Sequence, residues 1–411
     1  MKAVPDEPRK YIEATNAQAA KKPGGICGDY ITTERTAEAT TVIVADGIGT
    51  GIKARVAAVM CASRLMELIR VGFTLREACQ KVVETMHAAR TMDIPFSAFS
   101  VCRVLVSGHA TVVSYEIPSP ILINNRLAAY LPKQRVFPMG LEMVGEVNCM
   151  LEYGDSVVMV SDGVSQAGLG QQYRMGWGIQ GACDFINGLL AQGTLMKDIP
   201  GRIVANVRDI SGATYGDDTT CSLLLCREAR VLNILTGPPA RKMDDARVVR
   251  EFMDTKGMRI VCGSSSAEIV ARNLGVPVEM KNMSNAYHKP PSYDIKGVDY
   301  ATEGAITLNQ VYNILGEAPE KLEPDSSVSD LYRFFHASDT INFLVGTAAN
   351  PGHEHIVFRQ MGVYPRDVIQ FIMREVGMDA SVYACIEWDG AYIHSLPVPR
   401  RFPCTLMTVE L

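Results

Sequence analysis

VIVADGIGTG, residues 42–51, joins four apolar residues to an aspartate and then places glycine at every second position. The β-branched run at 40–45 predicts a buried strand, and IKARVAAVMCASRLMELI from residue 52 predicts a largely buried helix. Asp46 therefore stands where a strand ends and a tight glycine turn begins. Two interpretations follow: a phosphate-binding loop, or a metal ligand with glycines clearing space around it.

The phosphate-loop interpretation fails in its details. GIGTGIKA is not G-x-x-x-x-G-K-[ST], because Ile52 precedes Lys53 and Ala54 follows it. It is not G-x-G-x-x-G either, because the third glycine comes one residue early. The carboxylate of Asp46 would also repel pyrophosphate unless a metal stood between them. Nucleotide binding stays a minority alternative.

Length and composition exclude several classes of protein. The chain has 411 residues, 47% of them apolar, which is enough for two hydrophobic cores and long for one. The net charge of -5, with dispersed basic residues, argues against nucleic-acid or anionic-membrane binding. Eleven cysteines without a C-x-x-C pair indicate reduced, buried thiols and a cytoplasmic location. No segment has the apolar core of a signal peptide or a membrane span, so we expect a soluble protein.

The order of elements indicates two domains of different class. Thr74 and Glu77 form a capping-box pattern, which predicts a second helix after the one that begins at residue 52. Short β-rich runs follow, with a further strand pair expected to turn at Gly154-Asp155, and then two helices and a strand. Blocks of this kind predict an α+β sandwich for residues 1–230. Strands and helices then alternate, which predicts a smaller, doubly wound parallel α/β domain at 231–411.

Three aspartates share one setting in the first domain. Asp46, Asp162 and Asp217 each lie at the edge of a β-run, and glycine directly follows the first two. Strand ends that are distant in sequence can meet at one rim of a sandwich. Carboxylates in close contact repel one another, so their convergence requires a cation. Oxygen ligands without His or Cys favour Mg²⁺ or Mn²⁺ over zinc. One Asp-Gly pair alone would more often be a hairpin turn.

These motifs carry a resemblance to a known family. ADGIGTGIKA, VSDGVSQAG and GDDTT, in this order, resemble the three acidic motifs of the metal-dependent serine/threonine protein phosphatases of the 2C type (PPM), specifically the bacterial SpoIIE-like branch. GGICGDY at 24–30 is similar to the first motif of that branch, and VFPMGLE and MGWGI resemble its connecting segments. The resemblance covers about residues 20–228. Each motif is weak alone, but the ordered set is specific.

The resemblance implies an α-β-β-α sandwich and a metal-dependent phosphatase. Asp46 would bridge two Mn²⁺ or Mg²⁺ ions, and Gly47 would be a ligand through its carbonyl. Asp162 and Asp217 would be terminal ligands, and Asp29 would act through water. A water that bridges the ions would attack phosphoserine or phosphothreonine on a partner protein. The implied substrate class is a small phosphorylated regulator of the anti-anti-sigma type.

The sequence departs from the eukaryotic relatives at two positions. Ile48 stands where many of them have a histidine that protonates the leaving group, and it cannot transfer a proton. Lys21 or Lys22 is only a loose counterpart of their upstream basic phosphate grip. An alternative function is therefore a phosphoprotein-binding or metabolite-sensing module with little or no turnover.

The second domain resembles an uncharacterised extension of some SpoIIE-like proteins, and this resemblance does not indicate what the domain does. In IVCGSSSAEIV, the turn Gly263–Ser266 could hold a small anion at a helix N-terminus or provide ordinary serine caps, and we weigh these two interpretations equally. Asp299 and residues 300–304 are expected near the same crevice. For Cys262, a buried strand thiol is favoured over a nucleophile. For His353 and His355, exposure on a loop is favoured over metal binding.

Overall fold

The structure, a computed structural model, divides the chain into two compact units. The first unit comprises residues 1–34 and 38–228, and the second comprises residues 229–411 with the short segment 35–37. The residues described are 10–36, 38–49, 51–92, 94–212, 215–281, 290–346, 348, 368, 369 and 372, and as backbone 384–388, 391–397 and 405–410.

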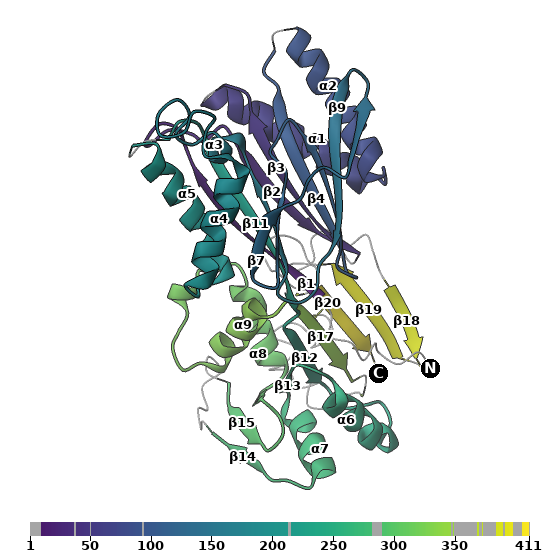
Figure 1. Ribbon diagram of the computed structural model, residues 1–411. Helices are drawn as coiled ribbons and strands as arrows, with labels where there is room; N and C mark the ends of the chain where they lie inside the picture. Colours follow the sequence, from purple (N-terminus) through teal and green to yellow (C-terminus); the bar gives the residue numbers. More distant parts are fainter. Residues whose placement is uncertain are drawn as a thin grey trace. The chain divides into compact units, whose positions relative to one another are not determined.

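Two sheets form the centre of the first unit (Figure 1). One has the order β2 (Tyr30–Arg35), β3 (Ala39–Gly47), β4 (Ser97–Leu105), β5 (His109–Tyr115), β9 (Glu142–Met150), β8 (Arg135–Met139). The other has the order β1 (Lys10–Ala19), β11 (Thr219–Glu228), β10 (Ser156–Val160), β6 (Ile121–Asn124), β7 (Leu127–Tyr130). The helices are α1 (Ile52–Arg70), α2 (Leu75–Thr91), α3 (Asp162–Ser165), α4 (Gly178–Ala191) and α5 (Ile199–Ile210), with a 3₁₀ turn at Met196–Asp198.

Alternation along the strands supplies three apolar layers. In β3, Val42 and Val44 face the core between the sheets, whereas Ile43 and Ala45 face α1 and α2. In the opposite sheet, α4 and α5 cover the outer face in the same way. Because β3 is buried on both faces, its sequence is continuously apolar rather than alternating. The layers therefore run α-β-β-α, which confirms the sandwich implied by the acidic motifs.

Local sequence signals place the helices of the first unit well. Helix α1 begins at Ile52, directly after the glycine turn, and presents a buried face rich in alanine. Thr74 caps α2, and the Glu77 side chain accepts a hydrogen bond from the Thr74 backbone, which confirms the capping box.

The predicted strand pair around Gly154-Asp155 is wrong. Strand β9 pairs with β5 and β8, whereas β10 pairs with β11 and β6, so the connection crosses from one sheet to the other. Gly154 N–H donates to the Cys226 carbonyl at 2.8 Å, and Cys226 N–H donates to the Asp155 carbonyl at 2.9 Å. The turn is therefore hydrogen-bonded to the end of β11 and cannot bring β9 alongside β10.

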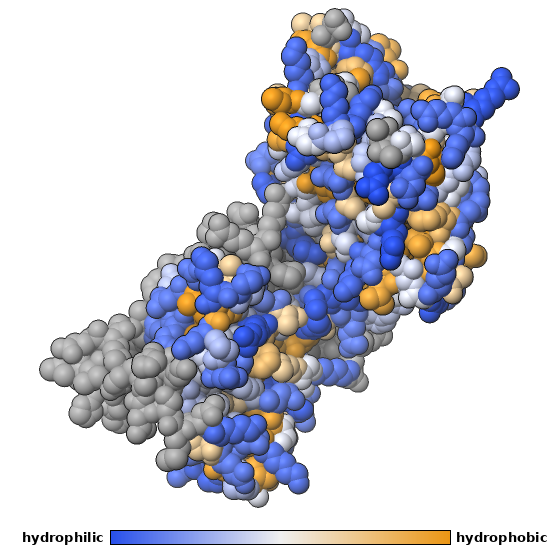
Figure 2. All heavy atoms as spheres, turned by 90° about the vertical axis from the view of Figure 1, so that its left-hand side faces the viewer, coloured by the Kyte–Doolittle hydropathy of each residue, from blue (hydrophilic) through white to orange (hydrophobic). Residues whose placement is uncertain are grey.

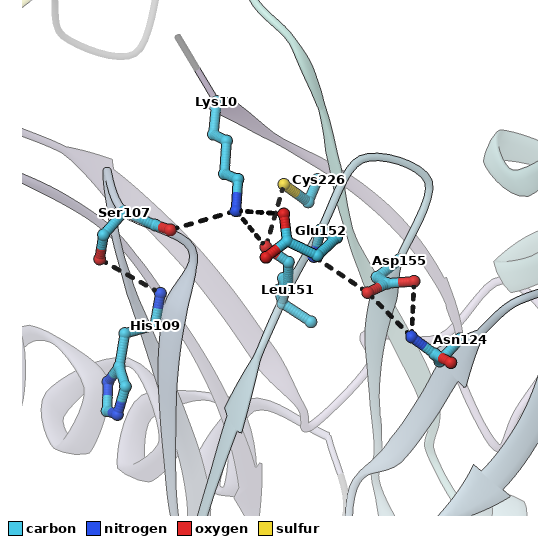
Figure 3. A network of polar contacts seen from close by, with 8 residues as sticks. All are labelled: Lys10, Ser107, His109, Asn124, Leu151, Glu152, Asp155 and Cys226. Carbon is cyan, nitrogen blue, oxygen red and sulfur yellow. Dashed lines mark hydrogen bonds and ion pairs between the residues drawn. The ribbon is translucent and has the colours of Figure 1, made fainter. Parts of the chain in front are cut away.

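One lysine joins three segments near this crossover (Figure 3). Lys10 Nζ donates to the carbonyl oxygens of Ser107 at 3.2 Å and Leu151 at 2.9 Å, and to Glu152 Oε2 at 2.7 Å. Its side chain is only 14% exposed. The hydrogen bond to Glu152 raises the pKa of Lys10 above 10.5. The ammonium group thus holds β1 against the turns after β4 and β9.

The second unit is built on one mixed sheet. Its order is β14 (Val278–Met280), β15 (Ser292–Ile295), β16 (Tyr300–Thr302), β13 (Met258–Cys262), β12 (Val231–Thr236), β17 (Thr340–Val345), β20 (Thr405–Glu410), β19 (Ala391–Pro397), β18 (Ala384–Trp388). Its helices are α6 (Asp245–Asp254), α7 (Ser264–Leu274), α8 (Ala305–Ile314) and α9 (Ser327–Ala337), with 3₁₀ turns at Lys242–Asp244 and Pro319–Lys321.

The centre of this sheet is parallel. It consists of five strands in the order β16, β13, β12, β17, β20. Helices α6 and α7 pack on one face and α8 and α9 on the other. This arrangement confirms the predicted doubly wound domain, and antiparallel strands extend both edges. The same alternating pattern predicts a helix near 365–376, and this segment falls almost entirely outside the described residues.

No helix of the described part of the chain is long and apolar enough to cross a membrane. The face shown in Figure 2 is mainly hydrophilic, with apolar side chains in small separate patches.

Replacing Lys10 with methionine should destabilise the first unit. The change keeps the length of the side chain but removes the lysine donor from the Ser107 and Leu151 carbonyls and leaves Leu151 only the weak Cys226 thiol, so we expect a loss of about 1–3 kcal/mol in the free energy of unfolding. Because the Lys10 pKa is raised, this contribution is present at neutral pH and is lost as the pH rises through the folded-state pKa. Chemical denaturation of the full chain measures it. Lys22→Met, at an exposed position, is the control, and equal stability of the two variants would contradict the role of Lys10.

Candidate functional site

The four predicted acidic residues lie at strand ends. Asp29 immediately precedes β2, Asp46 is the penultimate residue of β3, and Asp162 opens α3 just after β10. Asp217 lies two residues before β11. Ser161 N–H donates to the Thr220 carbonyl at 3.0 Å, so the β10 and β11 ends that carry acids lie side by side. Both sheets therefore contribute carboxylates to the site.

Electrostatic coupling shows that these carboxylates converge. Burial, together with the charges of Asp29 and Asp162, raises the pKa of Asp46 well above its usual range. Burial also raises the pKa of Asp29. The pKa of Asp217 is raised by burial and by Asp162, while Lys21 opposes the shift. Asp29, Asp46 and Asp162 thus form a close group, and Asp217 interacts electrostatically with Asp162 at its edge. Their assignment as metal ligands, with the Gly47 carbonyl, stays a prediction.

The glycines of the Asp-Gly pairs are required by close backbone approach. A Cβ on Gly47 would lie 2.0 Å from the Ala54 carbonyl oxygen, at the start of α1. A Cβ on Gly163 would lie 2.1 Å from the Asp218 carbonyl oxygen. Each motif glycine therefore lets a second backbone segment pack directly against the turn that carries a carboxylate. This contact, rather than the turn alone, explains why glycine follows both aspartates.

Asp218 has a positioning role that the sequence did not reveal. It is buried, and its carboxylate accepts hydrogen bonds from Lys21 N–H at 2.8 Å and from Gly28 N–H at 2.9 Å. It therefore fixes both ends of the loop that leads to Asp29. The only sequence signal was its position as the second acid of GDDTT.

Other polar side chains hold the backbone and carboxylates of the site. Arg55 donates a hydrogen bond to the Asp29 carbonyl oxygen, and its guanidinium lies over the Tyr30 ring at 4.8 Å. Ser97 Oγ donates to the Asp46 carbonyl at 2.8 Å. Gln166 Nε2 donates to Asp162 Oδ2 at 2.8 Å. No motif pointed to these residues, because their contacts arise only when distant segments meet.

Of the two lysines considered as a phosphate grip, Lys21 is the one placed at the cluster. Its Nζ lies 3.8 Å from Asp217 Oδ1, and the two side chains are 40% and 38% exposed. Such a pair is weak, so the ammonium group can exchange Asp217 for another anion. Ile48 is 44% exposed at the rim of the site.

The chemistry of the cluster fits a divalent cation. Both carboxylate oxygens of Asp29 are buried and make no hydrogen bond of normal geometry, although the Thr220 and Ser161 side chains lie near enough to oppose the rise in its pKa. Within the described residues, no three acidic, His or Cys side chains form a ready-made ligand set. The fit therefore depends on the oxygen-only donors and on their unbalanced negative charge, which a cation would neutralise.

Two secondary predictions can also be placed. Cys262 is fully buried in β13, and burial raises its pKa, as expected for a structural thiol. His353 and His355 lie outside the described residues.

Comparison with known proteins gives one family match. Residues 36–227 match the family model described as Stage II sporulation protein E (SpoIIE). The match begins after Asp29, so it covers Asp46, Asp162 and Asp217 but not the earlier motif. No curated protein matched the chain.

Several solved structures are similar at low identity. The PP2C phosphatase domain of SpoIIE from Bacillus subtilis, with a fragment of its regulatory domain, shares 16% identity at a TM-score of 0.45, over 54% of this chain and 64% of that one. The RsbU and RsbW domains of Rv1364c from Mycobacterium tuberculosis share 18% identity at a TM-score of 0.45, over 60% and 69%. The catalytic domain of the serine threonine protein phosphatase PstP, in complex with two manganese ions, shares 13% at a TM-score of 0.39, over 53% and 100%.

The chain spans about 64% of the length of the SpoIIE structure. The family assignment rests on the matched model and on the ordered acidic motifs within it. Residues 36–227 of this chain therefore form a SpoIIE domain, as the resemblance of the three motifs predicted.

Proposed function

We propose that the first domain, residues 1–230, is a metal-dependent protein serine/threonine phosphatase that acts in bacterial signalling. The observation that carries this proposal is the clustering of Asp46 with Asp29 and Asp162, which brings carboxylates from both sheets to one site. Asp29 and Asp46 are buried, and the Asp29 oxygens make no hydrogen bond of normal geometry. A structural role does not account for such a cluster, because buried carboxylates without compensating charge are costly. A cytoplasmic location stays a prediction.

The proposed cofactors are two Mn²⁺ or Mg²⁺ ions. Asp46, the Gly47 carbonyl, Asp162 and Asp217 would hold them, and Asp29 would act through water. Such ions lower the pKa of water and neutralise the phosphoryl oxygens during in-line attack. The protein would then need no nucleophile of its own. Asp218 and Ser97 would fix the loops that carry the ligands.

The surface beside the site supports a protein as substrate. Ile48, Ile52, Val56 and Met60 are four residues apart and are 44%, 67%, 50% and 66% exposed. Within α1, Ile52, Val56 and Met60 form an exposed apolar stripe, and Ile48 lies in the turn before the helix, two residues after Asp46. Exposed apolar stripes of this kind typically contact other proteins. Within the phosphoprotein class, the motif resemblance favours an anti-anti-sigma-type regulator.

A binding module with little turnover is the second candidate function. The exposed Ile48 side chain favours it, because this position offers no proton for a leaving serine or threonine. The two functions differ in one measurable way: only the phosphatase hydrolyses an aryl phosphate, whose leaving group needs little protonation.

Replacing the acidic residues should abolish hydrolysis. We expect Asp46→Asn, Asp162→Asn and Asp217→Asn each to reduce Mn²⁺-dependent hydrolysis of an aryl phosphate at least about 100-fold, because each removes a charge that the metal requires. Chelation of the metal should have the same effect on the unmodified chain. Without metal, Asp46→Asn should be at least as stable as the unmodified chain, because it removes one buried charge from a group of carboxylates that repel one another.

Asp155→Asn is the matched control, because Asp155 is also buried but lies at the opposite end of β10. It accepts hydrogen bonds from Asn124 Nδ2 and Glu152 N–H. The Asp155→Asn variant should be less stable than the unmodified chain but should retain its activity. Activity that survives in two of the three site variants would refute the ligand assignment.

Ile48→His tests whether the site lacks a general acid for the leaving group. The unmodified enzyme should show a steep dependence of the chemical step on the leaving-group pKa. A reachable imidazole should flatten it, since general acid catalysis typically supplies roughly 10² to 10⁴-fold. A series of phosphate esters, measured under single-turnover conditions, gives the slope. A shallow slope in the unmodified enzyme would mean that another residue donates the proton.

A further inference from the structure

The carboxyl ends of the parallel strands in the second unit lead into glycines. Gly237 follows β12, Gly263 follows β13, Gly304 follows β16 after one residue, and Gly346 follows β17. Ligands of doubly wound sheets bind at this edge. The chain therefore offers several points where its backbone could approach a ligand closely.

The edge between β12 and β17 is filled by the protein backbone. Gly346 N–H donates to the Thr236 carbonyl at 2.8 Å, and a Cβ on Gly346 would lie 2.2 Å from the Pro238 carbonyl oxygen. A ligand at this edge would have to displace these contacts. The turn after β13 differs, because Ser264 and Ser265 are exposed there.

Helix α7 begins at this turn without a cap. Its N-cap residue is Gly263, with φ of 119°, and no side chain accepts a hydrogen bond from the first turn. The first intrahelical bond runs from Ala267 N–H to the Gly263 carbonyl at 2.9 Å. In the part of the chain that the structure describes, the N–H groups of Ser264, Ser265 and Ser266 have no acceptor.

A buried hydroxyl group points to a ligand at the same place. Ser266 is only 2% exposed, and its Oγ has no hydrogen-bond partner. This Oγ lies 3.4 Å from the position that a Cβ on Gly263 would occupy, so it faces the glycine turn. Buried hydroxyl groups normally have a hydrogen-bond partner. A buried hydroxyl without one, beside three N–H groups that have no acceptor, indicates that a ligand with acceptor atoms binds here.

In the neighbouring helix α8, a side chain accepts a hydrogen bond from an N–H group of the first turn. Helix α8 begins after Gly304, which lies against Gly263: a Cβ on Gly304 would be 3.1 Å from the Gly263 Cα. The carboxylate of Glu303 accepts a hydrogen bond from Ile306 N–H at 3.0 Å and so supplies an oxyanion to the first turn of α8. Helix α7 has no corresponding carboxylate within the described residues.

We propose that the turn Gly263–Ser266 binds the phosphate group of a small phosphorylated metabolite. The three N–H groups, the Ser266 hydroxyl and the α7 dipole would donate to the phosphate oxygens, which are acceptors only. The site belongs to the second unit and does not depend on the proposed phosphatase function. Asp299 does not take part, contrary to the sequence expectation, because it accepts from Arg259 N–H at the amino ends of β13 and β16.

Titration of the full chain with inorganic phosphate tests this site, with a chelator present so that the acidic cluster holds no metal. Phosphate should raise the thermal midpoint of the unmodified chain. Ser265→Asp should raise the midpoint without phosphate and abolish the phosphate-dependent shift, because the new carboxylate occupies the helix N-terminus. Ser63→Asp, on the exposed face of α1, is the matched control and should leave the phosphate response unchanged.

Ser266→Ala separates binding from folding. It should fold as stably as the unmodified chain, because it removes an unsatisfied hydroxyl, and it should weaken phosphate binding about tenfold in calorimetry. The response should persist in Asp46→Asn, whose loss of hydrolysis tests the phosphatase proposal separately. No response to phosphate, an equal response in Ser265→Asp, or an equal response to acetate would overturn the proposal.

Discussion

Repulsion between buried carboxylates is the constraint on which the first unit depends. Burial, together with the nearby charges of Asp29 and Asp162, raises the pKa of Asp46 strongly, and the repulsion between these carboxylates disfavours their arrangement. The apolar layers around them impose it, because β3 and β10 are fixed by cores on both faces. Burial of these apolar layers thus offsets the repulsion between the carboxylates, and a bound divalent cation would reduce that repulsion.

The acidic motifs are also joined through their backbones. Gly47 packs against Ala54, and Gly163 packs against the Asp218 carbonyl, at distances that exclude any side chain. Asp218 in turn binds the loop before Asp29 through two N–H groups. A change at one motif would therefore displace the carboxylates of another, because closely packed segments transmit strain.

The two units offer candidate sites of opposite charge. In the first, the clustered carboxylates would need a cation before a phosphoryl group could approach. In the second, the N–H groups at the start of α7 would attract an anion directly at the proposed site. The two sites are built from separate residues, so each can be tested without disturbing the other.

The sequence by itself determined the features that local patterns encode. The strand at Val42–Ala45, helix α1 and the capping box at Thr74 follow from periodicity and end signals within a few residues. The three acidic motifs also identified the SpoIIE domain. The mismatch came at Gly154-Asp155, where turn-forming residues predicted a hairpin but the chain crosses between sheets.

Tertiary structure alone decided which distant groups meet. The bond from Arg55 to Asp29, the role of Asp218 and the orphan hydroxyl of Ser266 have no local signature in the sequence. Strand pairing depends on which apolar faces can be buried together across the whole unit, whereas turn residues specify only a few backbone angles. For this reason the sequence could name the acidic residues, and only the packing of the two sheets could bring them to one rim.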